Sequence, residues 1–370
     1  MVNRQRMVEE FLELVRIDSL TFKEKEMVEC LKTKLKSMCI EAKEDNAGEK
    51  IGGNAGNLIC KIEGSKNVPA VLLMAHMDTV EPGIGKKPVV DGKIIRTDKS
   101  TILGGDDVAG IECILEAVRV LKEDKMSHGD IYIVFTVAEE GGLWGAKNLD
   151  VSKINAKFAF VMDDAGSIGH VAVVAPAQNK IDITIYGKAA HAGMEPEKGV
   201  SAIQIAAQAI SGMKLGRIDN ETTANIGVIG GGQATNIICD KIEIKAEARS
   251  RDMEKLKVQT EHMKDCFDRA ANRFGGKVVF ESEMLYPAFS ISQDDDIIKI
   301  LEKASKKAGI ELKPEATGGG SDTNIINSKG IKTVDVSVGM DKVHSVEEQI
   351  CIDDLVKAAD FLVSIITSVE

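Results

Sequence analysis

Three apolar runs constrain the fold of this chain most strongly, and each ends at residues with metal-binding side chains. The runs are Ala70–Ala75, Ile131–Ala138 and Ala159–Met162, followed by His76, by Glu139-Glu140 and by Asp163-Asp164, respectively. Strands that are apolar on both faces are typical of sheets covered by helices. Apolar residues at helical spacing lie between the first two runs, over Val108–Lys122. The pattern predicts an α/β fold with a mixed, mostly parallel sheet flanked by helices.

The hydrophobic pattern changes in the middle of the chain. Alternating residues at 179–187 predict a strand, and the segments that follow predict the order β-α-β-β-α-β, which fits a split α+β sandwich. The chain has 370 residues, and a single core rarely grows beyond about 250–300 residues. We therefore expect one domain formed by residues 1–178 and 288–370, with a second domain inserted at 179–287.

Composition excludes several function classes. The chain has 47 Lys and Arg against 58 Asp and Glu, for a net charge of −11, which argues against nucleic-acid binding. No apolar run approaches the roughly 20 residues of a membrane span, and the first residues lack a signal-peptide core. Seven scattered cysteines without a C-x-x-C pair indicate reduced thiols and a cytoplasmic location. No G-x-S-x-G, H-E-x-x-H or P-loop motif occurs.

Five candidate ligands cluster at the predicted carboxyl ends of the strands, where α/β sheets bind their ligands. They are His76, one of Glu139 and Glu140, Asp163 and His344, the last after a fourth predicted strand at Ile331–Val338, and Asp106 joins them from a glycine-flanked loop at the start of a helix. Imidazoles with carboxylates are ligands that zinc accepts, and five of them suit two ions that share one carboxylate. Taken singly, each residue has a simpler interpretation, such as a helix N-cap for Asp106-Asp107. Their coincidence at four strand ends favours a metal site.

Two neighbours of these ligands have predicted supporting roles. Glu139 and Glu140 are adjacent, and adjacent residues of an extended chain point to opposite sides, so one can bind a metal while the other faces a water. Asp78 follows His76 by two residues and can return on the same side to hold the second imidazole nitrogen.

Four motifs carry a resemblance to a known family. His76-Met-Asp-Thr, Gly105-Asp-Asp-Val-Ala-Gly, Ala138-Glu-Glu-Gly-Gly and His344-Ser-Val-Glu-Glu resemble the dinuclear zinc exopeptidase/deacylase family. That family includes peptidase T, glutamate carboxypeptidase, aminoacylase and succinyl-diaminopimelate desuccinylase. The resemblance is closest to the peptidase T-like members and covers the whole chain, including Gly187–Pro196 of the predicted insertion.

The resemblance implies a zinc exopeptidase fold and two divalent ions, zinc by preference, with cobalt or manganese also suited to such ligands. Asp106 would bridge the ions, His76 and Asp163 would complete one site, and Glu140 and His344 would complete the other. We take Asp163 rather than Asp164 because it is the first residue after the predicted strand. A cis peptide would follow Asp106.

The resemblance also implies how amide hydrolysis would proceed. A hydroxide shared by the ions would attack, Glu139 would be the general base, and Asp78 would orient His76. His191 would donate to the oxyanion, in cis or, as in family dimers, from the partner chain.

Residues that resemble the family's substrate-binding positions are Asn236, Arg249, Gly319 and Gly320. Arginine suits a bidentate carboxylate contact, although Arg249 also fits an exposed charge at a strand end. Tripeptidases carry an arginine where this chain has Gly318, which removes one cationic anchor and leaves strict tripeptide specificity open.

The expected function is hydrolysis of short peptides by an aminopeptidase or tripeptidase of the peptidase T-like class. Alternatives on the same site are an N-acyl-amino-acid deacylase and a carboxypeptidase. An alternative of another class is a catalytically silent peptide- or metal-binding protein, against which the intact Glu139 argues. The inserted domain would act as a lid and as the surface of a homodimer.

Overall fold

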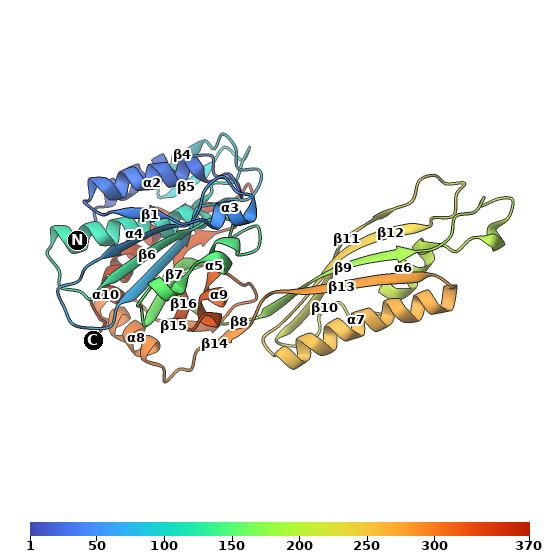
Figure 1. Cartoon of the computed structure of the whole chain (residues 1–370). Coiled ribbons are helices and arrows are strands. Elements are labelled where there is room, and N and C mark those ends of the chain that lie inside the picture. Colours follow the sequence, from blue (N-terminus) through green and yellow to red (C-terminus); the bar gives the residue numbers. More distant parts are fainter. The chain divides into compact units, whose positions relative to one another are not determined.

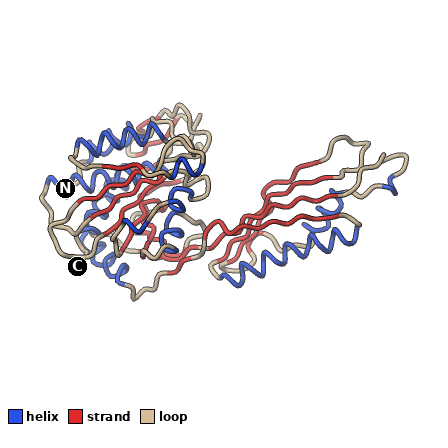
Figure 2. Tube along the Cα trace, in the orientation of Figure 1, coloured by secondary structure: helices blue, strands red, loops and turns tan.

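The computed structural model describes all residues, 1–370, and the chain divides into two compact units. The larger unit comprises Met1–Val173, Ser290–Thr317 and Ser321–Glu370; the inserted unit comprises Val174–Phe289 and Gly318–Gly320. Both units mix helices and strands, as Figure 2 shows.

The larger unit is built on a 12-stranded mixed sheet with the order β1-β2-β6-β3-β7-β16-β17-β5-β4, and β8 pairs with β14, β15 and β16. Its strands are β1 Ala42–Glu44, β2 Leu58–Ile62, β3 Val71–His76, β4 Pro88–Asp91, β5 Ile94–Thr97, β6 Ile131–Thr136, β7 Phe158–Ala165, β8 His170–Ala175, β14 Phe289–Ser290, β15 Lys313–Ala316, β16 Lys332–Asp341 and β17 Gln349–Cys351. The central strands β6, β3, β7 and β16 pair in parallel. The α/β fold with a mixed sheet is confirmed, and its parallel part is the centre that the apolar runs predicted.

Helices cover this sheet (Figure 1). They are α1 Arg4–Leu14, α2 Lys25–Ser37, α3 Ala47–Ile51, α4 Gly105–Glu123, α5 Trp144–Asn148, α8 Asp296–Ala308, α9 Asp322–Ser328 and α10 Ile352–Ile366, with a short 3₁₀ helix at Val151–Lys153. Helix α4 packs on β3, β7 and β16, and α10 packs on α4 and α8. All six residues of β3 are buried, as expected for a strand with both faces covered. The parallel pairing of β6, β3, β7 and β16 places their carboxyl ends at one edge of the sheet.

The inserted unit has an antiparallel sheet with the order β10-β11-β12-β9-β13. Its elements are β9 Ala177–Tyr186, α6 Ala202–Ser211, β10 Gly216–Arg217, β11 Thr222–Gly231, β12 Lys241–Ser250, α7 Met253–Phe274 and β13 Lys277–Tyr286, with a 3₁₀ helix at Pro196–Lys198. Alternate residues of β12 are buried, because α6 and α7 pack on one face of the sheet. The order follows the predicted β-α-β-β-α-β, with the short β10 added.

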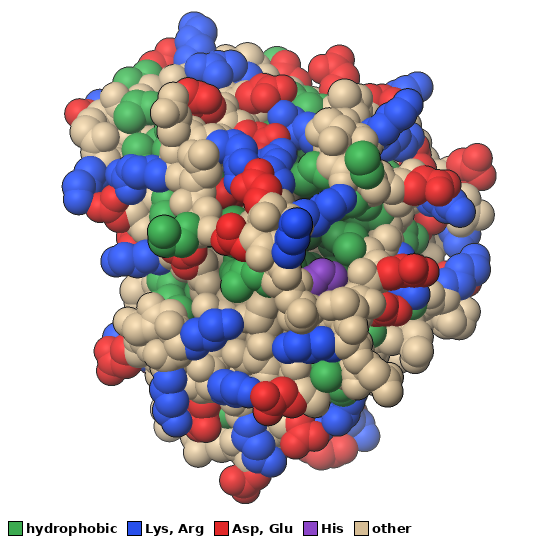
Figure 3. Space-filling view, turned by 90° about the vertical axis from the view of Figure 1, so that its left-hand side faces the viewer, with side chains coloured by type: hydrophobic (Ala, Val, Ile, Leu, Met, Phe, Trp, Pro, Cys, Tyr) green, Lys and Arg blue, Asp and Glu red, His purple; other side chains and the backbone are tan.

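Two surface properties bear on partners. No helix combines the length and apolar character needed to cross a bilayer. On the face that Figure 3 shows, Lys and Arg side chains are interspersed with Asp and Glu, so this face carries no continuous basic stripe.

Candidate active site

Five residues that the sequence predicts as ligands meet at the edge of the larger sheet. His76 ends β3, Asp106 lies in the first turn of α4, Glu140 lies in the turn after β6, Asp163 lies within β7, and His344 lies between β16 and β17. Strand β7 continues to Ala165 because Asp164 and Ala165 still pair with β16. Asp163 is therefore inside the strand, and the expectation that it is the first residue after the strand is wrong.

The two imidazoles share one carboxylate. Nε2 of His76 lies 2.9 Å from Oδ1 of Asp106 and 3.5 Å from Oδ1 of Asp163. Nε2 of His344 lies 3.1 Å from Oδ2 of Asp106 and 2.7 Å from Oε1 of Glu140. Each imidazole thus forms a trio with two carboxylates. The N–H of one ring donates a good hydrogen bond to only one acceptor, whereas a cation between the ring and the two carboxylates would be bound by all three side chains. The donor set thus fits two cations that share Asp106.

Electrostatics within the cluster favour positive charge. Hydrogen bonds to Asp106 and Glu140 raise the pKa of His344 to about 10. Burial lowers the pKa of His76, but Asp163 and Asp106 outweigh it, so this pKa lies well above its ordinary value. Burial raises the pKa of Asp163 to about 8. The cluster thus favours protons on both imidazoles and on Asp163, and binding of divalent cations would displace these protons.

Asp107 has a separate structural role beside Asp106. The Asp106–Asp107 peptide is cis, as the resemblance implied. The Asp107 carboxylate accepts hydrogen bonds from the backbone N–H groups of His76, at 3.1 Å, and Gly110, at 3.0 Å. The bond to Gly110, three residues on, is that of a helix N-cap. The N-cap interpretation therefore holds for Asp107, while Asp106 faces the imidazoles.

Comparison with known proteins identifies the family. Residues 72–368 match the model of Peptidase family M20/M25/M40. The chain belongs to this family. It is 48% identical to the YqjE protein of Bacillus subtilis over 99% of both chains. The structure of aminopeptidase PepT from Bacillus cereus is 44% identical, with a TM-score of 0.92 and 99% of each chain covered. A tripeptidase structure from Staphylococcus aureus is 43% identical, with a TM-score of 0.96, covering 99% of this chain and 98% of that one.

Membership of the M20/M25/M40 family confirms the predicted resemblance and the predicted enzyme class. The chain is a peptidase with a candidate metal site, and these findings support metal-dependent peptide hydrolysis.

Asp78 differs from its predicted contact. Nδ1 of His76 lies 2.9 Å from the backbone carbonyl oxygen of Asp78, whereas the nearest carboxylate oxygen is 3.6 Å away. The carboxylate instead accepts hydrogen bonds from the N–H groups of Glu139 at 2.9 Å and Glu140 at 3.2 Å, and from the Thr21 hydroxyl at 2.8 Å. Asp78 therefore orients His76 through its backbone and holds the Glu139–Glu140 turn through its side chain.

Glu139 lies in a turn rather than an extended segment, because Ala138 before it has a positive φ of 51°. The expected strand-like alternation of Glu139 and Glu140 is thus replaced by a turn in which Asp78 binds both backbone N–H groups. Burial raises the pKa of Glu139 well above its ordinary value. A carboxyl group in this state holds a proton readily, as a general base must after accepting one.

Three buried carboxylates that sequence reasoning missed also accept backbone N–H groups of the site. Glu24 accepts from Ala138 at 3.1 Å, Glu348 from Asp106 at 3.0 Å, and Asp335 from Asp163 at 3.1 Å. Asp335 had a signal, since it is an acidic residue within the apolar run Ile331–Val338. Glu348 belongs to the His344-Ser-Val-Glu-Glu motif, whereas nothing in the sequence near Glu24 marks it.

In the inserted unit, the structure brings His191 and Asn236 together. The N–H of Ala192 donates to the backbone oxygen of Asn236 at 2.9 Å. His191 is exposed, and its Nδ1 accepts from the N–H groups of Gly193 at 3.2 Å and Met194 at 3.1 Å. A neutral ring that accepts at Nδ1 carries its proton on Nε2, so Nε2 is available as a donor.

Arg249 and the glycine loop form a second group in this unit. The guanidinium donates from Nη2 and Nε to the carboxylate of Glu247, at 3.0 and 3.1 Å, and its Nη1 lies 3.5 Å from the carbonyl oxygen of Gly318. A Cβ at Gly320 would lie 2.2 Å from the Tyr286 ring. Arg249 is the ninth residue of β12, whereas Asn236 precedes that strand, so the structure does not bring the two groups together.

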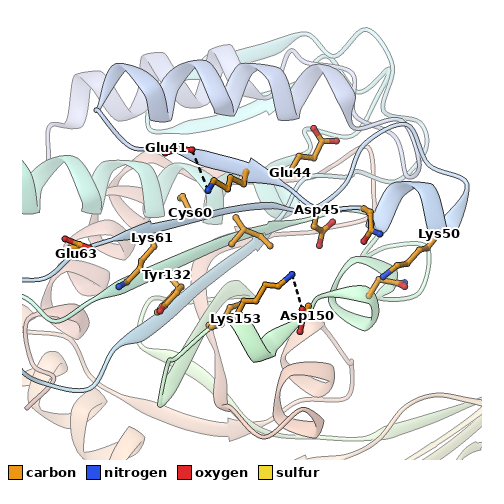
Figure 4. Close-up of a pocket in the computed structure, with 15 residues that line it drawn as sticks. Glu41, Glu44, Asp45, Lys50, Cys60, Lys61, Glu63, Tyr132, Asp150 and Lys153 are labelled. Atoms are coloured by element: carbon orange, nitrogen blue, oxygen red, sulfur yellow. Dashed lines mark ion pairs between the residues drawn. The ribbon is translucent and has the colours of Figure 1, made fainter.

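A separate groove of about 940 Å³ lies in the larger unit over β1, β2 and β6. Figure 4 shows the residues that line it, with charges of both signs and ion pairs between Glu41 and Lys43 and between Asp150 and Lys153. None of the predicted ligands lines this groove.

Proposed function

We propose that the protein is a dinuclear metal-dependent exopeptidase that removes N-terminal residues from short peptides. The observation that carries the proposal is the pair of imidazole–carboxylate trios that share Asp106, with buried Glu139 beside them. The aminopeptidase and tripeptidase relatives support the choice of aminopeptidase chemistry.

Five residues would hold the ions. His76 and Asp163 would complete one site, Glu140 and His344 the other, and Asp106 would serve both. Zinc suits these nitrogen and oxygen donors, as do cobalt and manganese. When bound, such ions supply Lewis acidity and lower the pKa of water toward about 7.

Glu139 would move the proton in the reaction. Its carboxylate accepts a proton from the attacking water and then delivers it to the leaving amine, which needs a group that is easily protonated. Burial of Glu139 provides that property, and the two hydrogen bonds that the Asp78 carboxylate accepts from the N–H groups of Glu139 and Glu140 keep the turn in place.

His191 would stabilise the oxyanion through its Nε2 proton, since preorganised donors are worth most where negative charge develops. The two bonds that Nδ1 accepts hold the ring in the tautomer that such a donor requires. Asn236, on the loop that is bonded to the His191 loop through Ala192, would contact the substrate.

Substrate selection would depend on Arg249, Gly319 and Gly320. The Glu247 carboxylate already occupies Nη2 and Nε of Arg249, which weakens this residue as an anchor for a terminal carboxylate. With Gly318 in place of the tripeptidase arginine, the site favours short peptides in general over tripeptides alone. The second candidate is an N-acyl-amino-acid deacylase or carboxypeptidase on the same residues.

The remaining parts of the proposal concern setting and assembly. The seven free cysteines support a cytoplasmic enzyme, because thiols stay reduced there. We also propose a homodimer formed through the inserted unit, with no nucleic-acid or membrane partner.

The test combines metal analysis with a substrate screen. Wild type and Glu139→Gln are compared on dipeptides, tripeptides and N-acyl amino acids, after the ions per chain have been counted. We expect both proteins to bind two ions and only wild type to cleave peptides. Absence of two ions from wild type would refute the dinuclear site, and bound ions without any cleavage would favour a binding protein.

A further inference from the structure

The loop that carries His344 also carries a buried carboxylate, Glu348, which is 1% exposed. Its Oε2 accepts hydrogen bonds from the backbone N–H groups of Leu103 and Gly104, each at 2.8 Å. Its Oε1 accepts from the N–H of Asp106 at 3.0 Å. One side chain thus satisfies three backbone donors in the segment that leads into α4.

The placement of Glu348 is itself well supported. It directly precedes β17, whose Ile350 pairs with Met340 of β16 and with Ile95 of β5. Its own N–H donates to the carbonyl oxygen of Ser345 at 3.0 Å. The backbone of Glu348 is therefore held next to a strand that pairs on both of its sides, and the loop before α4 is bonded to the Glu348 carboxylate.

Glu348 links the segment that carries Asp106 to the segment that carries His344. Asp106 lies at one end of this link and His344, four residues before Glu348, at the other, with 3.1 Å between Oδ2 of Asp106 and Nε2 of His344. A shift of the Asp106 backbone would change its distance to both imidazoles at once. By contrast, the carboxylates of Asp78 and Asp335 accept from the N–H groups of Glu140 and Asp163, respectively, and each of those two ligands belongs to one trio only.

We propose that Glu348 is a positioning residue that sets Asp106 against His344 so that one carboxylate can serve two cations. This inference rests on the proposed dinuclear function. It assigns to Glu348 no contact with substrate, since its effect passes through the backbone of Asp106.

The chain offers a matched control in the adjacent Glu347. That side chain is 56% exposed and pairs only with the surface lysines Lys99, at 3.1 Å, and Lys342, at 3.9 Å. Glu347→Gln and Glu348→Gln remove the same charge one residue apart. Only the second removes an acceptor of backbone N–H groups, because a glutamine NH₂ cannot accept the bonds that one carboxylate oxygen accepts.

The experiment titrates Co²⁺ into chelator-treated wild type, Glu347→Gln and Glu348→Gln, followed by calorimetry and by the visible absorption of bound cobalt. Loss of a partner that orients a metal ligand commonly weakens metal affinity or activity by about 10–100-fold. We expect that loss for at least one of the two ions in Glu348→Gln, with an altered cobalt spectrum and a lower kcat at little-changed KM. Glu347→Gln should match wild type.

Wild-type cobalt affinities and spectrum in Glu348→Gln would overturn the inference. If circular dichroism shows that this variant does not fold, Glu348→Asp decides by the same criteria, because it keeps the charge on a shorter stem and should show a partial loss. Failure of the dinuclear function itself would be seen already in wild type, as the absence of two bound ions.

Discussion

At the scale of single residues, the site depends on buried carboxylates, and in one of them, Glu24, only one of the two oxygens accepts hydrogen bonds. Oε1 of Glu24 accepts from the N–H groups of Phe22 at 2.8 Å and Ala138 at 3.1 Å, whereas Oε2 is buried without a hydrogen-bond partner. Burial, and secondarily the charge of Asp78, raises the pKa of Glu24 to about 7 from its ordinary 4.5. The ionised form is therefore disfavoured in the fold.

This arrangement predicts a pH-dependent effect of Glu24→Gln. As pH rises from 4.5 to about 7, the unfolded chain loses this proton first, so the free energy of unfolding of wild type falls through that window. Glutamine keeps the Oε1 acceptor and cannot ionise. In chelator-treated protein, the variant should gain stability relative to wild type between pH 5 and pH 8, by up to about 3 kcal/mol.

Urea unfolding at the two pH values, followed by the fluorescence of Trp144, measures this gain. Trp144 is the single tryptophan of the chain and lies in the larger unit with Glu24. Glu26→Gln, at an exposed position in the first turn of α2, the helix that begins directly after Glu24, serves as the control. An equal stability difference from wild type at both pH values would contradict the assignment.

At the scale of elements, the sequence is informative wherever a strand ends at the sheet edge. The burial of β3, β6 and β7 follows from their apolar runs, and the carboxyl ends of parallel strands must meet. Bonds between distant segments leave no local signal, however. Glu348 and Asp106 are separated by 242 residues, and Glu24 and Ala138 by 114. The ligands could therefore be predicted, but most of the side chains that hold their backbones could not.

The turn after β6 gives a prediction at this scale. In wild type, two backbone N–H groups of the turn donate to the two oxygens of the Asp78 carboxylate. Asp78→Asn leaves only one oxygen to accept them. The turn should relax, and kcat should fall by about 10–100-fold, as for other lost orienting contacts. Thr21→Val removes only the hydroxyl bond to the same carboxylate and should cost much less. Steady-state kinetics with measured ion content compares the two variants, and equal losses would argue against a clamp on the turn.

At the scale of the whole molecule, the question is whether one chain holds a complete site. His191 and Asn236 precede β12, and Arg249 is near its end. From Lys241, the first residue of β12, to Arg249, the extended chain spans about 26 Å at roughly 3.3 Å per residue, whereas an extended tripeptide spans only about 10 Å. One short peptide bound at Arg249 therefore cannot also reach His191 of the same inserted unit. If both residues serve one substrate, as proposed, the histidine must come from a second copy of the chain.

Mixing two inactive variants tests this directly. Glu139→Gln lacks the base and His191→Ala lacks the donor, and each should retain its ions but lose most turnover. In a mixed dimer, the chain with intact Glu139 would receive the intact His191 of its partner, so one of its two sites would be complete. Random exchange makes half of the dimers mixed, so about a quarter of wild-type activity should return in a symmetric dimer. If each site were complete within its own chain, no mixture would regain activity. Sedimentation shows whether dimers form, and pull-down of one variant through an affinity tag on the other shows whether they exchange. A lack of recovery in exchanging dimers would place His191 in the site of its own chain.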